Sequence, residues 1–231
     1  VELSWNLTKG ASSYNIELFA NDSLTFAGSP ILTFSGITEE EIPFEIPENW
    51  KWVRLGEITS IKGGKRIPVG KKLTTVNTGY KYIRVADMKN GTVIDTDIHY
   101  IDEEIYKKIS AYTISKNDVY ITCAGTIGRI GIVPDFFDGA NLTENADKII
   151  LYFINKLWLC YALNSEAIQN QIRNVTTKVG QPKLAIKRIE NMIIPLPPLA
   201  EQKRIVEKLD NVLANIDELK ANEEKLSILQ K

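Results

Sequence analysis

The sequence has little cysteine and histidine, the residues that most often hold zinc. Cys123, Cys160 and His99 are its complete set, whereas a structural zinc site needs about four such ligands at close spacing. Neither cysteine belongs to a CxxC pair, so both are expected to be small buried apolar residues. His99 has no serine or cysteine motif to act with it and is expected in a strand or loop. No metal site is therefore expected in this chain.

Long hydrophobic runs are also missing. The longest apolar window, residues 149–163, is interrupted by Asn155 and Lys156 and is shorter than the roughly 20 residues that span a bilayer. The segment from Val1 to Gly10 lacks the basic start and apolar run of a secretory signal. These features predict a cytoplasmic protein.

Catalytic motifs were not found. The chain has no GxxxxGK[ST] loop, and the glycines at 125, 128 and 131 do not match a dinucleotide fingerprint. The "LPPL" at 196–199 lacks the polar and aromatic residues of a DNA methyltransferase tetrapeptide. A nuclease could be assembled only from Pro134, Asp135, Glu201 and Lys203, whose two halves are far apart in the sequence. We expect no catalytic residue and no cofactor in this chain, and keep the nuclease as a third hypothesis.

Charge is unevenly distributed along the chain. The net charge is -1, yet residues 51–90 carry ten basic and two acidic side chains, and residues 151–198 carry six and two. Lysine and arginine on glycine-bearing loops can neutralise phosphates, while polar side chains can read base edges. The basic segments therefore predict nucleic-acid contacts, although a charge run can also be an ordinary solvated surface. The candidate DNA-binding residues are Lys62, Lys65, Arg66, Lys71, Lys72, Tyr80, Lys81, Arg84, Lys178, Gln181 and Lys183.

The pattern of the chain predicts an α+β protein in three parts. Residues 1–41 alternate apolar and polar residues between turn signals, which predicts three short strands and an acidic linker. Residues 42–198 hold several β-rich runs, a predicted helix from Asn155 to Thr176 and a closing strand in "IENMIIPLPP". In "WKWVRLGEITSIKGG", Val53, Leu55, Ile58 and Ile61 are expected to point inward. Residues 199–231 form the third part.

The third part is predicted to be a coiled-coil helix. Its apolar residues recur in a heptad pattern, and the predicted interface consists of Ile205, Leu209, Val212, Ile216, Leu219 and Leu226. Such a stripe needs a partner, either another helix or a second copy of the chain. The alternative is a helix packed back on its own domain. The prolines before it favour a helix that leaves its domain at a fixed angle.

Several ordered motifs resemble one protein family. "GQPKLAIKRIENMIIPLPPLAEQKRIVEKLD", "IPFEIPENWKWVRLGEI", "YIRVADMKNGTV" and "ITCAGTIGRIGIV" followed by "ANLTENADKII" are similar to specificity subunits of type I restriction-modification enzymes. The resemblance covers roughly residues 42–231. It implies a target recognition domain at 42–198 and a spacer helix at 199–231. A full family member has two of each, so this chain corresponds to a half-subunit or a C-terminal half.

The resemblance implies a non-catalytic subunit that reads one half of a bipartite double-stranded DNA target. Its partners would be methyltransferase subunits, which use S-adenosylmethionine to methylate a flipped base, and indirectly a motor-nuclease subunit. A homodimer through the C-terminal helix is a further expectation. The alternative function is a coiled-coil protein-interaction module without DNA readout. Base-reading residues do not transfer by motif in this family, so the candidates above rest on charge and loop character.

Overall fold

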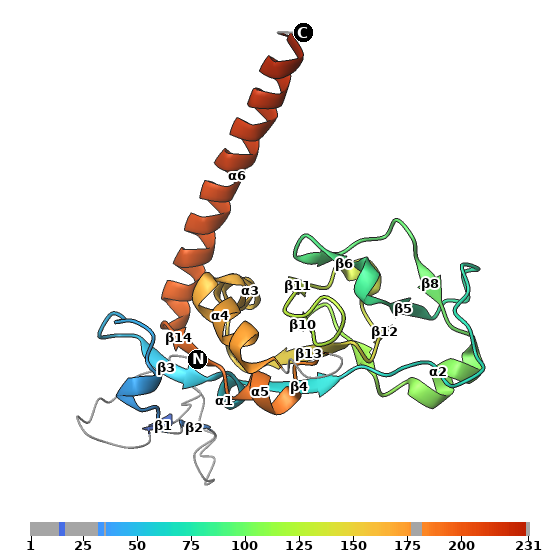
Figure 1. The fold of residues 1–231 in the computed structure, drawn as a ribbon, viewed down its shortest axis with the longest axis horizontal. Helices are drawn as coiled ribbons and strands as arrows, with labels where there is room; N and C mark the ends of the chain where they lie inside the picture. The colour runs from blue at the N-terminus through green and yellow to red at the C-terminus, as the bar shows by residue number, and fades with distance from the viewer. Residues whose placement is uncertain (1–13, 17–31, 35, 177–181, 230–231) are drawn as a thin grey trace, which may run out of the picture.

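The computed structural model describes residues 14–16, 32–34, 36–176 and 182–229, except for the side chains of residues 14–16, 32–34, 217 and 224–229. They form a body of small sheets with helices at both ends. One long helix, α6 (Leu199–Leu229), leaves one end of this body (Figure 1). The expected α+β fold, a β-rich domain followed by a long helix, is confirmed.

Two four-stranded sheets make up the body. The first has the strand order β11-β10-β13-β4 and is antiparallel throughout. The second has the order β8-β5-β12-β9, in which only β5 and β12 run parallel. The strands of the first sheet are β4 (Thr59–Gly63), β10 (Val119–Thr122), β11 (Ile130–Ile132) and β13 (Ala146–Leu151). Those of the second are β5 (Lys81–Ile83), β8 (His99–Tyr100), β9 (Thr113–Ile114) and β12 (Ala140–Leu142).

Alternating side chains place the two sheets face to face. On β10, Val119 and Ile121 pack into one apolar cluster, whereas Tyr120 between them packs into another. That second cluster also contains Ile83 of β5 and Leu142 of β12. Because successive side chains of a strand point to opposite faces, the second cluster is the layer between the sheets.

Helices cover the outer faces. The helix α2 (Glu103–Ile109) packs Ile105 and Ile109 against the second sheet. It begins at Asp102, whose carboxylate accepts a hydrogen bond from the backbone nitrogen of Ile105 at 2.7 Å, a standard helix cap. The helices α3 (Lys156–Asn164) and α4 (Glu166–Val175) cover the first sheet.

The prediction of one helix from Asn155 to Thr176 was wrong in one respect, because the structure divides it into α3 and α4. Ser165 has the extended angles φ -64° and ψ 150° and serves as the end of one helix and the start of the next. Its hydroxyl donates to the carbonyl oxygen of Ala162 at 2.7 Å. Serine readily forms such local bonds. The apolar stripe continues across the break, so periodicity alone does not reveal it.

Short elements join these layers. The strand β3 (Lys51–Arg54) pairs with β14 (Ile193–Leu196), which confirms the predicted closing strand. All of the inward-pointing residues predicted around β3 and β4 are buried: Val53, Leu55, Ile58 and Ile61. The other short elements are α1 (Leu55–Ile58), α5 (Ile186–Glu190), β6 (Met88–Lys89), β7 (Thr92–Val93) and 3-10 helices at Glu39–Glu41, Val85–Asp87 and Asp135–Phe137.

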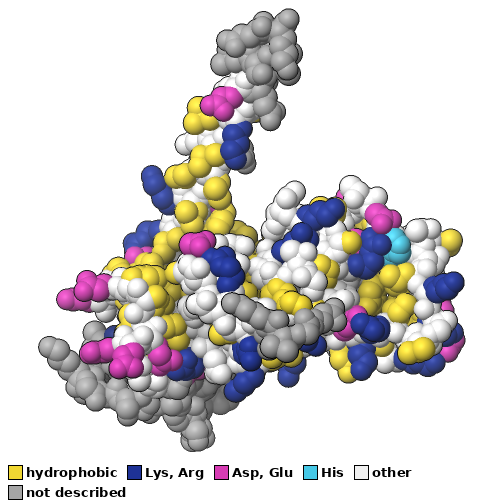
Figure 2. Space-filling view, in the orientation of Figure 1, with side chains coloured by type: hydrophobic (Ala, Val, Ile, Leu, Met, Phe, Trp, Pro, Cys, Tyr) yellow, Lys and Arg dark blue, Asp and Glu magenta, His cyan; other side chains and the backbone are white. Residues whose placement is uncertain are grey.

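The first turns of α6 belong to the body and the later turns leave it. Val206 is buried and Ile205 packs against the same core, while the hydroxyl of Tyr161 on α3 donates to the carboxylate of Asp210. Beyond this point the helix projects from the body, with apolar side chains along it (Figure 2). A helix packed wholly on its own domain is therefore not what the structure has.

The N-terminal segment is described in part. Of the three strands predicted in residues 1–41, the structure has β1 (Tyr14–Ile16) paired with β2 (Leu32–Phe34), and most of the remaining segment lies outside the described residues. In the acidic linker, Glu41 forms an ion pair with Arg54 at 2.7 Å. The domain boundaries proposed from the sequence stay predictions.

Three smaller expectations can be compared with the structure. Cys123 and Cys160 are buried, and His99 lies in β8, as predicted. Within the described ranges, no helix combines the length and apolar character needed to cross a membrane.

Candidate nucleic-acid interface

The two basic segments of the sequence meet at the end of β4. Lys65 and Arg66 follow this strand, and Lys183 comes from the second segment, where its neighbour Leu184 donates to the carbonyl oxygen of Cys123 at 2.9 Å. All three cations line one hollow of about 480 Å³. Lys62 lies on β4 opposite Lys148 of β13. The structure thus brings three of the predicted residues together in this hollow, whereas Lys62 is not among the residues that line it.

Gly64 makes this turn of the chain possible. Its backbone nitrogen donates to the carbonyl oxygen of Ala146 at 3.0 Å, and the nitrogen of Lys65 donates to that of Leu142 at 2.8 Å. A Cβ at position 64 would collide with the carbonyl oxygens of Thr143 and Leu142. Only glycine fits against this backbone, so the "KGGKR" sequence holds two cations at the strand end.

Two carboxylates share the hollow with the cations. Glu144 pairs with Arg66 at 2.6 Å, and the Arg66 side chain remains 73% exposed. Asp147 is 4% exposed, and its Oδ2 has no hydrogen-bond partner among the described residues. Burial raises the pKa of Asp147 to about 6, with Cys123 and Lys183 opposing this shift. The hollow therefore combines exposed positive charge with one buried carboxyl whose pKa is raised to about 6.

Of the other predicted residues, Lys71 and Tyr80 contact α2, whereas Lys81 and Lys72 are placed differently. Lys71 pairs with Glu104 of α2 at 2.5 Å, and Tyr80 stacks on Tyr106 with ring centroids 4.3 Å apart. Lys81 lies over the ring of Phe136 at 4.4 Å, and Lys72 is exposed.

Lys65 also contacts residues outside the hollow. Its Nζ lies 5.4 Å from the centroid of the Tyr112 ring, and its carbonyl oxygen accepts a hydrogen bond from the hydroxyl of Tyr82 at 2.9 Å. Tyr112 in turn packs against the apolar cluster beneath α2. Lys65 thus lies between the hollow and the apolar cluster beneath α2.

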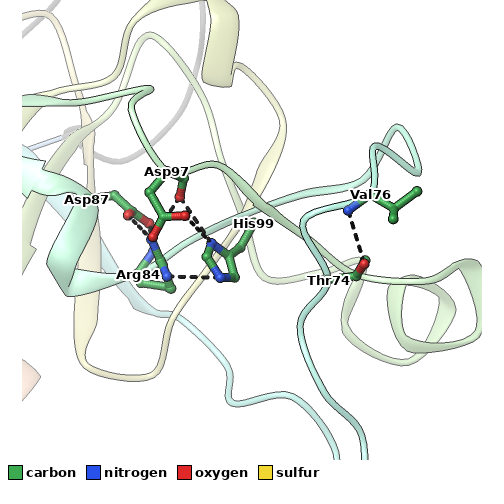
Figure 3. Close-up of polar contacts among 6 residues, drawn as sticks. All are labelled: Thr74, Val76, Arg84, Asp87, Asp97 and His99. Atoms are coloured by element: carbon green, nitrogen blue, oxygen red, sulfur yellow. Dashed lines mark hydrogen bonds and ion pairs between the residues drawn. The ribbon is translucent and has the colours of Figure 1, made fainter.

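Arg84 is engaged within the protein (Figure 3). Its guanidinium donates to Asp87 at 2.5 Å and to Asp97 at 2.9 Å, and one nitrogen lies 3.2 Å from Nε2 of His99. The hydrogen bond that Arg84 donates to the carboxylate of Asp87 is the main reason why the pKa of Arg84 is raised. Two carboxylates already compensate this cation. The arrangement ties β5 to the segment before β8, and a phosphate contact would have to compete with it.

Other predicted residues are placed elsewhere or not described. Lys178 and Gln181 lie outside the described residues. The hypothetical nuclease set is not assembled, since Asp135 pairs with Lys116 at 3.3 Å and Glu201 accepts a hydrogen bond from Asn49 at 2.9 Å. Among the residues that the structure describes, no group of three or more His, Cys, Asp or Glu side chains is placed to hold a metal ion.

Sequence reasoning missed the acidic members of the hollow, Glu144 and Asp147, and also Lys148. The run "NADKII" alternates as β13 does, which could have placed Asp147 beside Ile149 on the buried face. The pairing of β13 with β4, which brings Asp147 opposite Gly63, had no local sequence signal.

The predicted coiled-coil interface is divided between body and solvent. Ile205 and Leu209 are half-buried at the base of α6. Farther along, Val212 is 40%, Ile216 39% and Leu219 64% exposed. The side chain of Leu226 lies outside the described set. An apolar stripe that projects from the body in this way is available to another helix.

Comparison with known proteins identifies the family. The family model described as type I restriction modification DNA specificity domain matches residues 47–228. The EcoAI specificity subunit of Escherichia coli is 27% identical over 190 residues, which cover 80% of this chain and 32% of the relative. The MjaVIII specificity subunit of Methanocaldococcus jannaschii is 27% identical over 186 residues, which cover 78% and 43%.

Solved structures share the fold. The HsdS subunit of Thermoanaerobacter tengcongensis superimposes with a TM-score of 0.58 at 23% identity, covering 77% of this chain and 40% of that one. A chain from a structure of a type I R-M system gives 0.63 at 22% identity, covering 79% and 43%. The chain therefore spans less than half the length of these relatives. The resemblance seen in the sequence is confirmed, and the chain belongs to the family of type I restriction modification DNA specificity domains.

Proposed function

We propose that this chain is the non-catalytic part of a type I restriction-modification assembly that reads one half of a bipartite DNA target. The observation that carries this proposal is the convergence of two basic segments, which are far apart in sequence, on one hollow beside the exposed Lys65 and Arg66. Cations from separate segments gathered on one surface provide the sequence-independent part of DNA binding. Neighbouring polar and aromatic side chains are then available for base contacts.

The helix α6 supplies the second half of the proposal. Its exposed stripe of Val212, Ile216 and Leu219 suits an antiparallel helix from a second copy of this chain. Two copies paired in this way would place two recognition surfaces at opposite ends of the helix pair, and the two-fold symmetry would demand a two-fold symmetric, interrupted target. The proposed partners also include methyltransferase subunits, which would hold S-adenosylmethionine, and through them a motor-nuclease subunit. We place this assembly in the cytoplasm, where duplex DNA is accessible.

The test is to sequence the methylome of cells that express this chain with its cognate methyltransferase. We expect methylation at one interrupted motif with equivalent halves, and no such methylation without the chain. A second measurement follows binding of the purified assembly to that motif as salt increases, because phosphate contacts make affinity fall steeply with salt.

Two results would reject parts of the proposal. An assembly that forms without salt-dependent DNA binding would favour a protein-interaction module that uses only α6. A motif with two unrelated halves would show that the second recognition surface comes from a different protein segment rather than from a second copy.

A further inference from the structure

We propose that Val69 reads the 5-methyl group of a thymine in the major groove, which makes it a specificity-determining residue; this inference rests on the proposed function. Val69 lies in the basic segment between Arg66 and Lys71 and is 102% exposed, so its side chain stands clear of the rest of the described chain. Single exposed apolar residues are common on protein surfaces. Val69 differs from such residues in how its turn is held and in the cations that its segment carries.

The turn that carries Val69 is firmly held. The backbone nitrogen of Lys71 donates to the carbonyl oxygen of Pro68 at 3.1 Å, and Gly70 has a φ of +83°. A four-residue turn with glycine at its third position has the pattern of a type II turn. On either side, Ile67 and Leu73 pack against the apolar cluster beneath α2.

A charged contact adds a further anchor. Lys71, two residues after Val69, forms an ion pair with Glu104 of α2. A turn fixed by a backbone hydrogen bond, two packed flanking residues and an ion pair presents its tip in one position. Presentation in one position is what a specific contact requires, because little conformational entropy is lost on binding.

Neither packing nor turn geometry explains a valine at this tip. Turn positions favour glycine, proline, asparagine, aspartate and serine, and a β-branched apolar residue gains nothing from full exposure to water. The same segment carries several cations, including the exposed Lys65, Arg66 and Lys72. These can bind phosphates and bring the turn to the duplex, but a valine cannot contribute to phosphate binding.

The apolar feature that duplex DNA offers to such a side chain is the thymine methyl group, which projects into the major groove. The minor groove has no corresponding methyl. Residues that wedge between base pairs are typically longer, such as phenylalanine, leucine or methionine. The short, branched side chain of Val69 suits contact with a methyl group better than insertion into the stack.

The test uses the target duplex found by methylome sequencing, with each thymine of a half-site replaced in turn by deoxyuridine, which removes only the methyl group. For the wild-type assembly we expect one replacement to weaken binding about fourfold, as expected for one buried methyl-sized group. Val69→Ala should weaken binding to the thymine duplex by a similar factor. The decisive expectation is that the two losses are coupled: the Val69→Ala variant should bind the thymine and uracil duplexes with equal affinity.

Val76→Ala is the matched control. Val76 is 70% exposed on the same basic segment, in a turn held by a hydrogen bond from its backbone nitrogen to Thr74 Oγ1 at 3.1 Å (Figure 3). Its nearest cations in the sequence, Lys72 and Lys81, are four and five residues away, whereas Lys71 is two residues from Val69. This variant should still distinguish thymine from uracil. Unchanged thermal unfolding of both variants would show that the substitutions leave the fold intact.

Failure of the proposed function and failure of the inference about Val69 give different results. Absence of specific binding to the unmodified duplex would reject the proposed function, and this inference with it. Three results would overturn the inference but leave the proposed function intact. The recognised half-site could contain no thymine, or no replacement by deoxyuridine could change the affinity. The Val69→Ala variant could also still distinguish thymine from uracil. Loss of the distinction between thymine and uracil in Val76→Ala, but not in Val69→Ala, would also overturn the inference.

Discussion

Gln202 joins the start of α6 to the start of α3 through Asn155. Its side-chain oxygen accepts a hydrogen bond from the backbone nitrogen of Asn155 at 2.8 Å, and its amide donates to the carbonyl oxygen of Pro197 at 2.9 Å. Asn155 itself caps α3, since its Oδ1 accepts from the backbone nitrogen of Trp158 at 3.0 Å. One buried glutamine in the "PLPPLAEQKR" stretch thus sets how the long helix leaves the body.

We expect Gln202→Leu to lower the free energy of unfolding by about 1–3 kcal/mol, because the buried carbonyl of Pro197 and the partly buried backbone nitrogen of Asn155 lose their partners. Urea denaturation would measure this loss. Lys203→Ala, at the exposed neighbouring position, is the control and should change stability by no more than about 0.5 kcal/mol. Equal stability of the two variants would contradict the role given to Gln202.

Cations of the hollow should determine the salt dependence of DNA binding. Lys65→Ala and Lys183→Ala are each expected to weaken binding to all sequences and to reduce the slope of log affinity against log salt by about one. Fluorescence anisotropy at several salt concentrations measures this slope. Lys208→Ala, exposed on α6, is the control, and a slope that falls equally in all three variants would argue against a local interface.

A charge on the exposed stripe of α6 should prevent self-association. Ile216→Lys is expected to shift the chain to a monomer in sedimentation experiments, since burial of an unpaired lysine in a helix pair is costly. The fold of the body should survive, because Ile216 is 39% exposed. Ala214→Lys adds the same side chain on the opposite face of the helix and should leave association unchanged. A dimer that persists in the Ile216→Lys variant would exclude this stripe as the interface.

The length of α6 should set the spacing between half-sites. Deletion of one heptad, residues 208–214, shortens the helix by about 10 Å, which corresponds to about three base pairs of duplex. We expect the unspecified gap in the methylated motif to shrink accordingly while both half-sites stay the same. Methylome sequencing reads both quantities, and an unchanged gap would refute the spacer role.

Asp147 should make stability depend on pH. Burial raises its pKa from the ordinary 3.8 to about 6, so the folded state binds more protons than the unfolded state between these values. Stability from this group is therefore present at low pH and is lost as pH rises to about 6. As pH rises from 4 to 7, the free energy of unfolding of Asp147→Asn should increase by up to about 3 kcal/mol relative to that of the wild type. Urea denaturation at several pH values measures this difference. If the free energies of unfolding of the wild type and the variant change with pH in parallel, the raised pKa of Asp147 is contradicted.

Part of the fold could be predicted because its signals are local. The spacing of apolar residues from Val53 to Ile61 indicated an amphipathic element with these side chains inward. The heptad pattern from Ile205 to Leu219 indicated a long helix with an apolar stripe. The break at Ser165 could not be predicted in the same way, because the apolar stripe of α3 and α4 runs through it. Arg84 could not be separated from the other cations either, since its partners Asp87 and Asp97 are recognised only when the chain has folded.

The sequence by itself determined the basic segments, the shortage of metal ligands and the helix with its stripe, because composition and periodicity are properties of neighbouring residues. Only the tertiary structure decided that Lys65 and Lys183 share one hollow with the buried Asp147, and that Gln202 holds α6 to α3. These relationships arise from strand pairing and packing between segments far apart in the chain. Long-range contacts of that kind depend on how the whole core closes, and no local pattern encodes them.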